Sequence, residues 1–220
     1  MYSVCAVPSR HQEEVARACR DLAAAGLVSG TSGNLSARDG ERIAVTPTGG
    51  VLAEMEPEQV TIVDLAGNVV EGGLAPTSEV DLHLGVYARY GAGAVVHTHA
   101  PVATALSCVL DELPCVHYEM LLLGGTVRVA PYRTFGTPEL ADAVLDALEG
   151  RTAAMMANHG TVAYGADVAG ALRATEVLEW AATLYWRAAS IGTPRTLDQA
   201  DRQAVVDAVA ARGYGETRQA

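Results

Sequence analysis

Two histidines separated by a single residue, His97 and His99, begin the chemical interpretation of this sequence. They follow the apolar run 94–96, which predicts a buried strand, and residues two apart on a strand point to the same face. Such a pair also occurs by chance among packed or solvated histidines. A third histidine, His159, comes just after another apolar run, residues 153–157. Three neutral imidazoles with one open position are the ligand set of a catalytic zinc ion, so these histidines form the candidate metal site.

Glu79 ends the short polar run Pro-Thr-Ser-Glu, at the predicted start of a helix. The helix dipole alone favours a carboxylate there. Glu79 is therefore either a plain N-terminal charge or, beside a metal, a fourth ligand or general base. His83 lies four residues further on the same helical face. It is either another ligand or, as we favour, a hydrogen-bonded structural histidine, and we interpret His11 and His117 as non-ligands.

Three segments rich in glycine and hydroxyl residues are suited to a phosphate group, although each alone also fits an ordinary turn. They are Gly30-Thr31-Ser32-Gly33-Asn34, Thr46-Pro47-Thr48-Gly49-Gly50 and Thr77-Ser78. Glycine lets the backbone approach a phosphate closely, and hydroxyl and amide groups donate hydrogen bonds to it. Neither glycine-rich loop is a Walker motif, and neither has the spacing of a dinucleotide-binding loop.

The sequence contains no lysine, since all 15 of its basic residues are arginine. An enzyme without lysine cannot form a lysine Schiff base. Any carbon–carbon bond chemistry in this chain therefore needs another electron sink, and amine-based aldolase or pyridoxal chemistry is excluded.

The bulk composition predicts a folded protein that acts on small molecules. Half of the 220 residues are hydrophobic, which is ample material for a core. The net charge of −11 argues against nucleic acid or an anionic membrane as a partner. The four cysteines lack paired spacing and are expected to be reduced thiols. There is no signal-peptide pattern at the start and no apolar run of about 18 residues, so we expect a cytoplasmic protein.

Helices and strands alternate along the chain, which predicts a single α/β sandwich. Helices are predicted over residues 9–25, 79–90, 101–110, 137–150, 167–191 and 197–212, the first opened by a Ser9–Gln12 capping box and the second capped by Ser78. Strands are predicted over residues 43–46, 60–64, 69–70, 94–99 and 153–157. The apolar segments 116–123 and 126–130 are left open between the two types.

In chain order the motifs resemble the class II aldolases of the aldolase/adducin superfamily, most closely the L-fuculose-1-phosphate aldolases. The matching segments are residues 30–36, 46–49, Pro76–Glu79, His97–His99, His117-Tyr118, Thr134–Thr137 and Asn158–Gly160. The resemblance implies one domain over residues 1–220, built as a three-layer α/β/α sandwich around a mainly antiparallel sheet. It also implies a homotetramer with active sites at subunit interfaces.

The same resemblance implies a role for each candidate residue. His97, His99 and His159 would bind one Zn²⁺ per subunit, with Glu79 as the resting fourth ligand and the catalytic acid/base once substrate displaces it. The substrate phosphate would be held by Thr31, Gly33, Asn34, Thr48, Gly49, Thr77 and Ser78. Tyr118 would act as a second catalytic group, in the site of a neighbouring subunit. Phe135 and Tyr214 would line the aldehyde pocket.

The implied reaction is reversible cleavage of a ketose 1-phosphate to dihydroxyacetone phosphate and a small aldehyde such as L-lactaldehyde, with zinc as the Lewis acid. The alternatives on this scaffold are a methylthioribulose-1-phosphate dehydratase and a pentulose-5-phosphate 4-epimerase. The epimerases carry aspartate where this chain has Glu79, and a Thr-His-Ala-Asp pattern where it has His117-Tyr118-Glu119, so an aldolase is favoured. A non-catalytic relative would lack the three histidines. The sequence does not identify the aldehyde or the stereochemistry.

Overall fold

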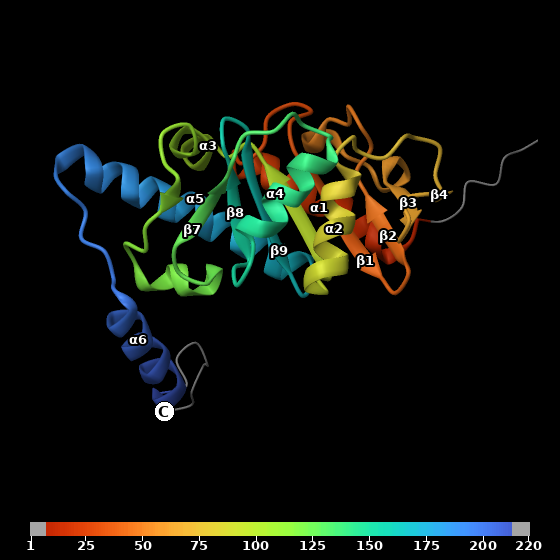
Figure 1. Cartoon of the computed structure of the whole chain (residues 1–220). Helices are drawn as coiled ribbons and strands as arrows, with labels where there is room; N and C mark the ends of the chain where they lie inside the picture. The colour runs from red at the N-terminus through yellow and green to blue at the C-terminus, as the bar shows by residue number, and fades with distance from the viewer. Residues whose placement is uncertain (1–7, 213–220) are drawn as a thin grey trace, which may run out of the picture.

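A nine-stranded sheet organises the computed structural model, which describes residues 8–212 (Figure 1). Its spatial order is β4-β3-β2-β1-β5-β9-β8-β7-β6. The strands are β1 (Asn34–Asp39), β2 (Arg42–Val45), β3 (Thr61–Asp64), β4 (Val69–Glu71), β5 (Ala94–Thr98), β6 (Glu112–Leu113), β7 (Val127–Ala130), β8 (Ala153–Met156) and β9 (Gly160–Gly165). Every neighbouring pair is antiparallel except β7 and β8, which run parallel.

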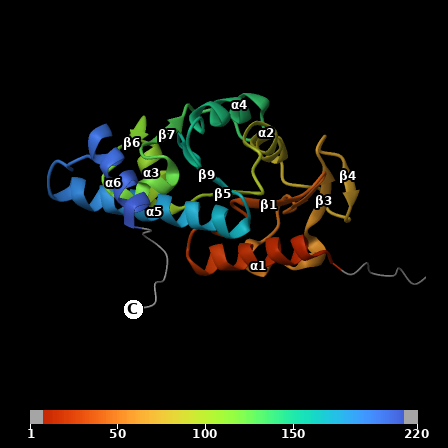
Figure 2. The same cartoon turned by 90° about the horizontal axis from the view of Figure 1, so that it is seen from below.

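Helices cover both faces of this sheet, as Figure 2 shows. On one face lie α1 (Arg10–Ala24) and α5 (Val168–Ile191), and on the other α2 (Val80–Tyr90) and α4 (Pro138–Ala147). The short α3 (Pro101–Ser107) packs with α5, while α6 (Gln199–Arg212) extends away from the body. Three 3-10 helices complete the chain: η1 (Leu52–Glu54), η2 (Pro57–Gln59) and η3 (Tyr118–Leu123). The expected three-layer α/β/α sandwich is confirmed.

The core divides between the two faces because side chains alternate along each strand. On β5, Val95 is buried with residues of α2 and α4, whereas Ala94 and Val96 are buried with residues of α1. His97 continues the alternation of Val95 and therefore faces the α2 side. Because side chains alternate along β5, the His97 ring therefore points toward the start of α2.

Helix starts follow the predicted signals with one correction. The Ser9–Gln12 capping box opens α1, with Gln12 N donating to Ser9 Oγ at 3.3 Å and Ser9 N donating to Gln12 Oε1 at 2.8 Å. Thr137 caps α4. The prediction that Ser78 caps α2 is wrong: Glu79 is the N-cap residue, and it makes no side-chain cap hydrogen bond. Its carboxylate points toward His97 and His159 instead.

Two central strands, β1 and β9, were not expected from the sequence. In β1, polar and apolar residues alternate, but the segment directly follows a glycine-rich loop, and its polar residues Asn34 and Ser36 are buried rather than exposed. In β9, the turn signal at Asn158–Gly160 runs directly into the strand. The open segments resolve as η3 and β7.

The thiols of the described residues are free, as expected. Cys19 and Cys115 are buried, Cys108 is exposed, and Cys5 lies outside the described residues. Burial raises the pKa of Cys19 to about 12, so this thiol is unreactive at neutral pH. Within residues 8–212, no helix combines the length and apolar character needed to cross a bilayer.

Candidate metal centre

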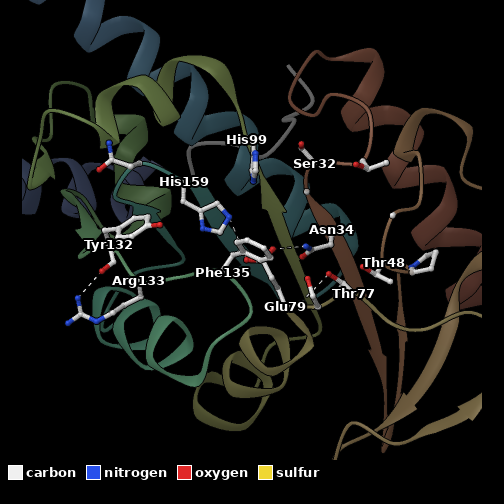
Figure 3. A pocket seen from close by; sticks show the side chains of 16 residues that line it. Ser32, Asn34, Thr48, Thr77, Glu79, His99, Tyr132, Arg133, Phe135 and His159 are labelled. Atoms are coloured by element: carbon white, nitrogen blue, oxygen red, sulfur yellow. Dashed lines mark hydrogen bonds and ion pairs between the residues drawn. The ribbon is translucent and has the colours of Figure 1, made fainter.

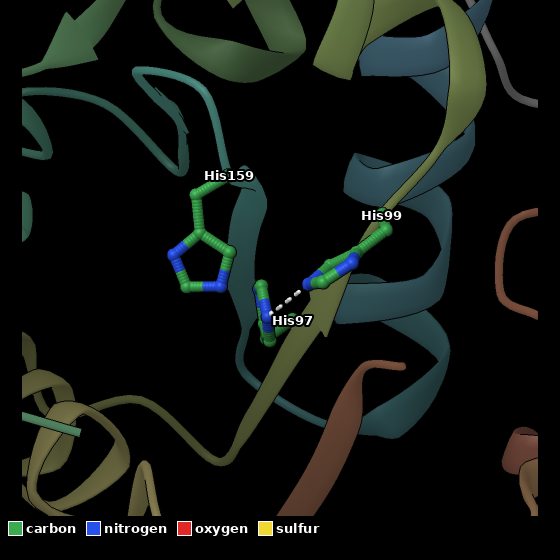
Figure 4. Close-up of side chains that lie close together, drawn as sticks. All are labelled: His97, His99 and His159. Atoms are coloured by element: carbon green, nitrogen blue, oxygen red, sulfur yellow. Dashed lines mark hydrogen bonds between the residues drawn. The ribbon is translucent and has the colours of Figure 1, made fainter. Parts of the chain in front are cut away.

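His97, His99 and His159 converge from two neighbouring strands (Figure 4). His97 lies in β5, His99 directly follows it, and His159 lies in the turn between β8 and β9. Their candidate ligand nitrogens all lie within 4.8 Å of one another, and the ring centroids are 4.9 to 5.1 Å apart. The predicted trio is therefore assembled in one place, and β5 and β9 are adjacent strands of the sheet.

The backbone fixes the orientation of the His97 ring. Its Nδ1 lies 2.8 Å from the carbonyl oxygen of Thr161 in β9, so Nδ1 carries the proton and donates it. Nε2 is the other ring nitrogen, and it faces His99 Nε2 at 3.1 Å. A carbonyl behind the distal nitrogen is the usual support of a metal-ligating histidine.

Close approach of β9 to β5 requires a glycine beside these rings. A Cβ on Gly160 would lie 2.4 Å from the carbonyl oxygen of Thr98 and 2.9 Å from Cδ2 of His99. Asn158, two residues earlier, has φ of 56°. Asparagine tolerates this left-handed conformation better than most residues. The Asn158-His159-Gly160 sequence is therefore the local reason that His159 turns toward the other two rings.

Glu79 places a buried carboxylate against the histidines. Its Oε2 lies 3.2 Å from His97 Nε2 and accepts a hydrogen bond of 2.9 Å from Asn34 Nδ2. Its Oε1 lies 3.6 Å from His159 Nε2 and, although buried, has no hydrogen-bond partner among residues 8–212. A buried carboxylate oxygen without a partner is costly unless a cation compensates it.

Electrostatics keep this cluster in the charge state that a metal requires. Burial raises the pKa of Glu79, but His97, Asn34 and His159 more than offset it, and the pKa is lowered overall. Burial, with His97 and His159 nearby, lowers the pKa of His99 to about 4. Burial and His97 also lower the pKa of His159. At neutral pH the site presents an ionised carboxylate with neutral His99 and His159.

These residues fit a divalent metal ion. Candidate ligand atoms of three side chains converge here, with His97 Nε2 at 3.1 Å from His99 Nε2 and at 3.2 Å from Glu79 Oε2, and one cation can bind such a group of atoms. Three nitrogens and one oxygen are a borderline ligand set that suits zinc and similar ions.

His83 is not part of this ligand set: the ring is fully buried and both nitrogens have protein partners, Ser36 and Asn34. Of the other two histidines, His11 lies 3.7 Å from Asp39 and His117 caps η3.

The predicted phosphate segments open onto the same cavity, which has a volume of about 460 Å³ (Figure 3). Figure 3 shows Asn34, Thr48 and Thr77 on one side of Glu79 and Tyr132 with Arg133 on the other. The predicted residues that line this cavity are Thr31, Gly33, Asn34, Thr48, Gly49, Thr77, Ser78, Glu79, His99, Phe135 and His159. Segments separated by more than 40 residues therefore meet beside the histidines.

Glycine is required in the first of these loops. Gly33 has φ of 103°, and a Cβ there would lie 2.8 Å from the carbonyl oxygen of His97. The loop can therefore sit directly against the metal-binding strand only with glycine at this position.

Two predicted tyrosines are not part of this cavity. Tyr118 lies at the start of η3 and lines an apolar surface with residues of α6, including Val205 and Val209. Tyr214 lies outside the described residues. Among the described residues of this chain, no tyrosine hydroxyl from η3 therefore reaches the cavity beside Glu79.

Sequence reasoning missed Tyr132 and Arg133 as lining residues, and it included Ser32, Pro47 and Asn158 only as members of motifs, without a role for their side chains. Arg133 is the single arginine among the described residues that line the cavity, and its Nη1 donates to the carbonyl oxygen of Tyr132 at 2.8 Å. The signal for both residues was their position directly before the Thr134–Thr137 segment. Arg133 lies across the cavity from the glycine- and hydroxyl-rich loops, where its positive charge favours anion binding although the protein has a net charge of −11.

Comparisons with known proteins agree with this geometry. The family described as class II aldolase and adducin N-terminal domain matches residues 13–186. A 5-deoxy-D-ribulose 1-phosphate aldolase of Bacillus thuringiensis is 37% identical over 210 residues, covering 94% of this chain and 98% of that protein. A 5-methylthioribulose-1-phosphate/5-deoxyribulose-1-phosphate aldolase of Rhodospirillum rubrum is 37% identical over 204 residues, covering 92% and 91%. A solved L-fuculose 1-phosphate aldolase has a TM-score of 0.88 and 34% identity, covering 94% of this chain and all of that one.

Proposed function

This chain belongs to the class II aldolase family and is a metal-dependent aldehyde-lyase, and we propose that it reversibly cleaves a ketose 1-phosphate to dihydroxyacetone phosphate and a small aldehyde. One observation carries the proposal. A single cavity is lined by His99, His159 and the buried carboxylate of Glu79 beside one group of glycine- and hydroxyl-rich loops, and the buried His97 clusters with the two lining imidazoles. That layout matches a substrate with a phosphate at one end and the scissile carbons near the metal.

Zn²⁺ is the proposed ion, held by His97, His99 and His159, with Glu79 as the fourth ligand at rest. When bound, it supplies Lewis-acid polarisation of the substrate oxygens, the role that a Schiff base plays in lysine-dependent aldolases. The absence of lysine from the whole sequence makes such a metal the electron sink that remains.

Glu79 is the proposed acid/base. Its lowered pKa keeps it ionised, and its unpartnered Oε1 faces the cavity side of the cluster, near His159. In the synthetic direction it takes the proton from the carbon of dihydroxyacetone phosphate that becomes nucleophilic, and in cleavage it returns that proton. Thr31, Gly33, Thr48, Gly49, Thr77 and Ser78 hold the phosphate, with the second Nδ2 proton of Asn34. This positioning lowers the barrier by removing orientational freedom.

A 5-deoxypentulose 1-phosphate is the preferred substrate, with L-fuculose 1-phosphate as the second candidate. Two relatives named for 5-deoxyribulose 1-phosphate match over nine-tenths of this chain. Cleavage between C3 and C4 releases a two-carbon aldehyde from the pentulose and lactaldehyde from L-fuculose. Both aldehydes end in a methyl group, which suits the exposed ring of Phe135 at the cavity and, as proposed, Tyr214.

We propose further that the enzyme is a homotetramer in which Tyr118 enters the site of a neighbouring subunit and transfers the proton at the aldehyde oxygen. Two observations support this. Tyr118 does not line the cavity of its own subunit, and it lies on an exposed apolar surface formed by η3 and α6. Large exposed apolar surfaces are typical of subunit interfaces.

A retro-aldol screen tests the proposed reaction. Purified enzyme is incubated with 5-deoxyribulose 1-phosphate, 5-methylthioribulose 1-phosphate, L-fuculose 1-phosphate and ribulose 5-phosphate, and dihydroxyacetone phosphate is followed by a coupled assay. We expect release from the 1-phosphates, abolition by a chelator and restoration by Zn²⁺. A dehydratase or an epimerase would consume its substrate without releasing dihydroxyacetone phosphate, and activity unaffected by exhaustive chelation would contradict the metal's role.

A further inference from the structure

A chain of five polar side chains runs through the protein interior and ends at Glu79. Tyr87 Oη lies 2.6 Å from Ser36 Oγ, which lies 2.7 Å from His83 Nδ1. His83 Nε2 lies 2.6 Å from Asn34 Oδ1, and Asn34 Nδ2 donates to Glu79 Oε2 at 2.9 Å. Each of the five residues is at most 7% exposed. The hydrogen-bond chain approaches the carboxylate from β1 and α2 and meets it at Oε2, the oxygen that also lies 3.2 Å from His97 Nε2.

Every hydrogen bond in this chain must point the same way. An ionised carboxylate only accepts, so Asn34 presents its NH₂ group to Glu79 and its Oδ1 to His83. His83 must then donate from Nε2, which leaves Nδ1 as the acceptor in a neutral ring. Ser36 donates to Nδ1, and Tyr87 donates to Ser36. Five side chains thus share a single donor direction that ends at Glu79.

His83 supports this direction from the other side of Asn34. Asparagine is nearly symmetric in shape, and a flipped amide would put Oδ1 against the carboxylate of Glu79 and Nδ2 against His83 Nε2. A donor at His83 Nε2 therefore holds Asn34 in the orientation that the carboxylate requires, and a side chain without that donor would leave Oδ1 of Asn34 buried without this partner. Burial lowers the pKa of His83 to about 3, so the ring stays neutral across the physiological pH range.

We propose that His83 is a positioning residue for catalysis: through Asn34 it fixes the orientation of the Glu79 carboxylate. His83 itself touches neither substrate nor metal. The proposal rests on the proposed function, since it takes Glu79 as the acid/base. It also assigns Asn34 a second role beside phosphate binding, because one Nδ2 proton is committed to Glu79 and the other remains for the substrate.

The tautomer of His83 tests the hydrogen-bond direction in the unmodified enzyme. Protein labelled with ¹⁵N-histidine is observed by NMR, and His83 is assigned by comparison with His83→Gln. We expect a ring protonated at Nε2 and unprotonated at Nδ1, unchanged between pH 5 and pH 8. Protonation at Nδ1 would reverse the chain and overturn the proposal, whatever the activity of the enzyme.

Substitutions test the catalytic consequence. Glutamine can donate to Asn34 and accept from Ser36, whereas leucine can do neither. We expect His83→Leu to lower kcat about 10- to 100-fold, the usual effect of removing such a supporting partner. The zinc content per subunit should be unchanged, and His83→Gln should recover most of kcat. Val86→Ala is the matched control, because Val86 is fully buried on the same helix but is not a member of the hydrogen-bonded series.

The results separate a positioning role from a structural one. Val86→Ala should lower the unfolding midpoint without changing kcat. Wild-type kcat in His83→Leu, or an equal loss of kcat in Val86→Ala, overturns the proposal. If the wild-type enzyme releases no dihydroxyacetone phosphate from any ketose phosphate, the proposed function fails. The NMR result still reports the direction of the hydrogen bonds between Tyr87 and Glu79.

Discussion

Opposing effects act on the pKa of the Glu79 carboxylate. Burial disfavours its charge, while nearby imidazoles and the amide of Asn34 favour it, and the favourable effects prevail because its pKa is lowered. The same carboxylate is therefore ready to bind a cation or to accept a proton from carbon. Its N-cap position on α2 contributes the helix dipole without using the side chain as a cap.

Glu79→Gln separates these two roles. The amide keeps the size of the side chain but cannot serve as a base, so we expect kcat to fall by about 10²- to 10⁴-fold. Zinc should be retained, because the three imidazoles remain. Glu176→Gln, at an exposed site on α5, is the control. Steady-state kinetics and metal analysis measure both properties; turnover at the wild-type rate would remove Glu79 from the mechanism, and loss of zinc would make it an indispensable ligand.

At the scale of elements, the pairing of β5 with β9 builds the metal site. His97 pairs with Val162 across the ladder, and Thr161 supports the ring of His97 through its carbonyl oxygen. The start of α3 is also fixed, since Glu179 of α5 accepts from Val102 N at 2.9 Å and from Ala103 N at 2.8 Å. His99 lies between these two fixed points. Its position is thus set by elements distant in sequence.

Gly160→Ala tests this pairing. The added methyl group would meet the backbone of Thr98 and the ring of His99, so β9 must move away from β5. We expect a loss of about 1 to 3 kcal/mol in the free energy of unfolding, typical of overpacking, together with weaker zinc binding. Urea unfolding and zinc titration measure the two effects. Gly192→Ala is the control, because Gly192 has extended backbone and no neighbour near the added Cβ; equal behaviour of the two variants would contradict the packing argument.

At the scale of the whole molecule, the surface formed by η3 and α6 is apolar and exposed to solvent. Leu122 is 58% exposed and Val206 is 49% exposed, and they lie on the surface that η3 and α6 share with Tyr118. No residue of α6 is buried within the subunit. A helix that buries nothing in its own subunit gains little from folding against it, which favours packing against another copy.

Leu122→Asp combined with Val206→Asp tests the assembly. Charges on this surface would oppose burial against another subunit, so we expect a tetramer in the wild type and smaller species in the double variant. Light scattering coupled to size exclusion measures the mass. Activity should fall with assembly, because Tyr118 of the partner subunit is withdrawn. Val109→Asp, at an exposed apolar residue outside this surface, is the control; a fully active wild-type monomer would contradict the proposed tetramer.

Local patterns were enough to predict much of this protein. The period of two put His97 and His99 on one face, and the apolar run before them predicted β5. Caps and glycines placed α1, α4 and the loop around Gly33. These features depend on residues a few positions apart, whose geometry the backbone fixes by itself.

The tertiary structure decided what depends on distant partners. Residues 34–39 and 160–165 lie on either side of β5 as central strands, although each segment is short and begins at a loop or turn signal. The bond from His83 to Asn34 joins residues 49 positions apart, and no periodicity encodes such a contact. Arg133 and Tyr132 likewise reach the cavity because β7 ends beside β8. Spacing along the chain determined the chemical groups, whereas strand order and packing determined which groups meet, because contacts between distant segments depend on how the whole core is filled.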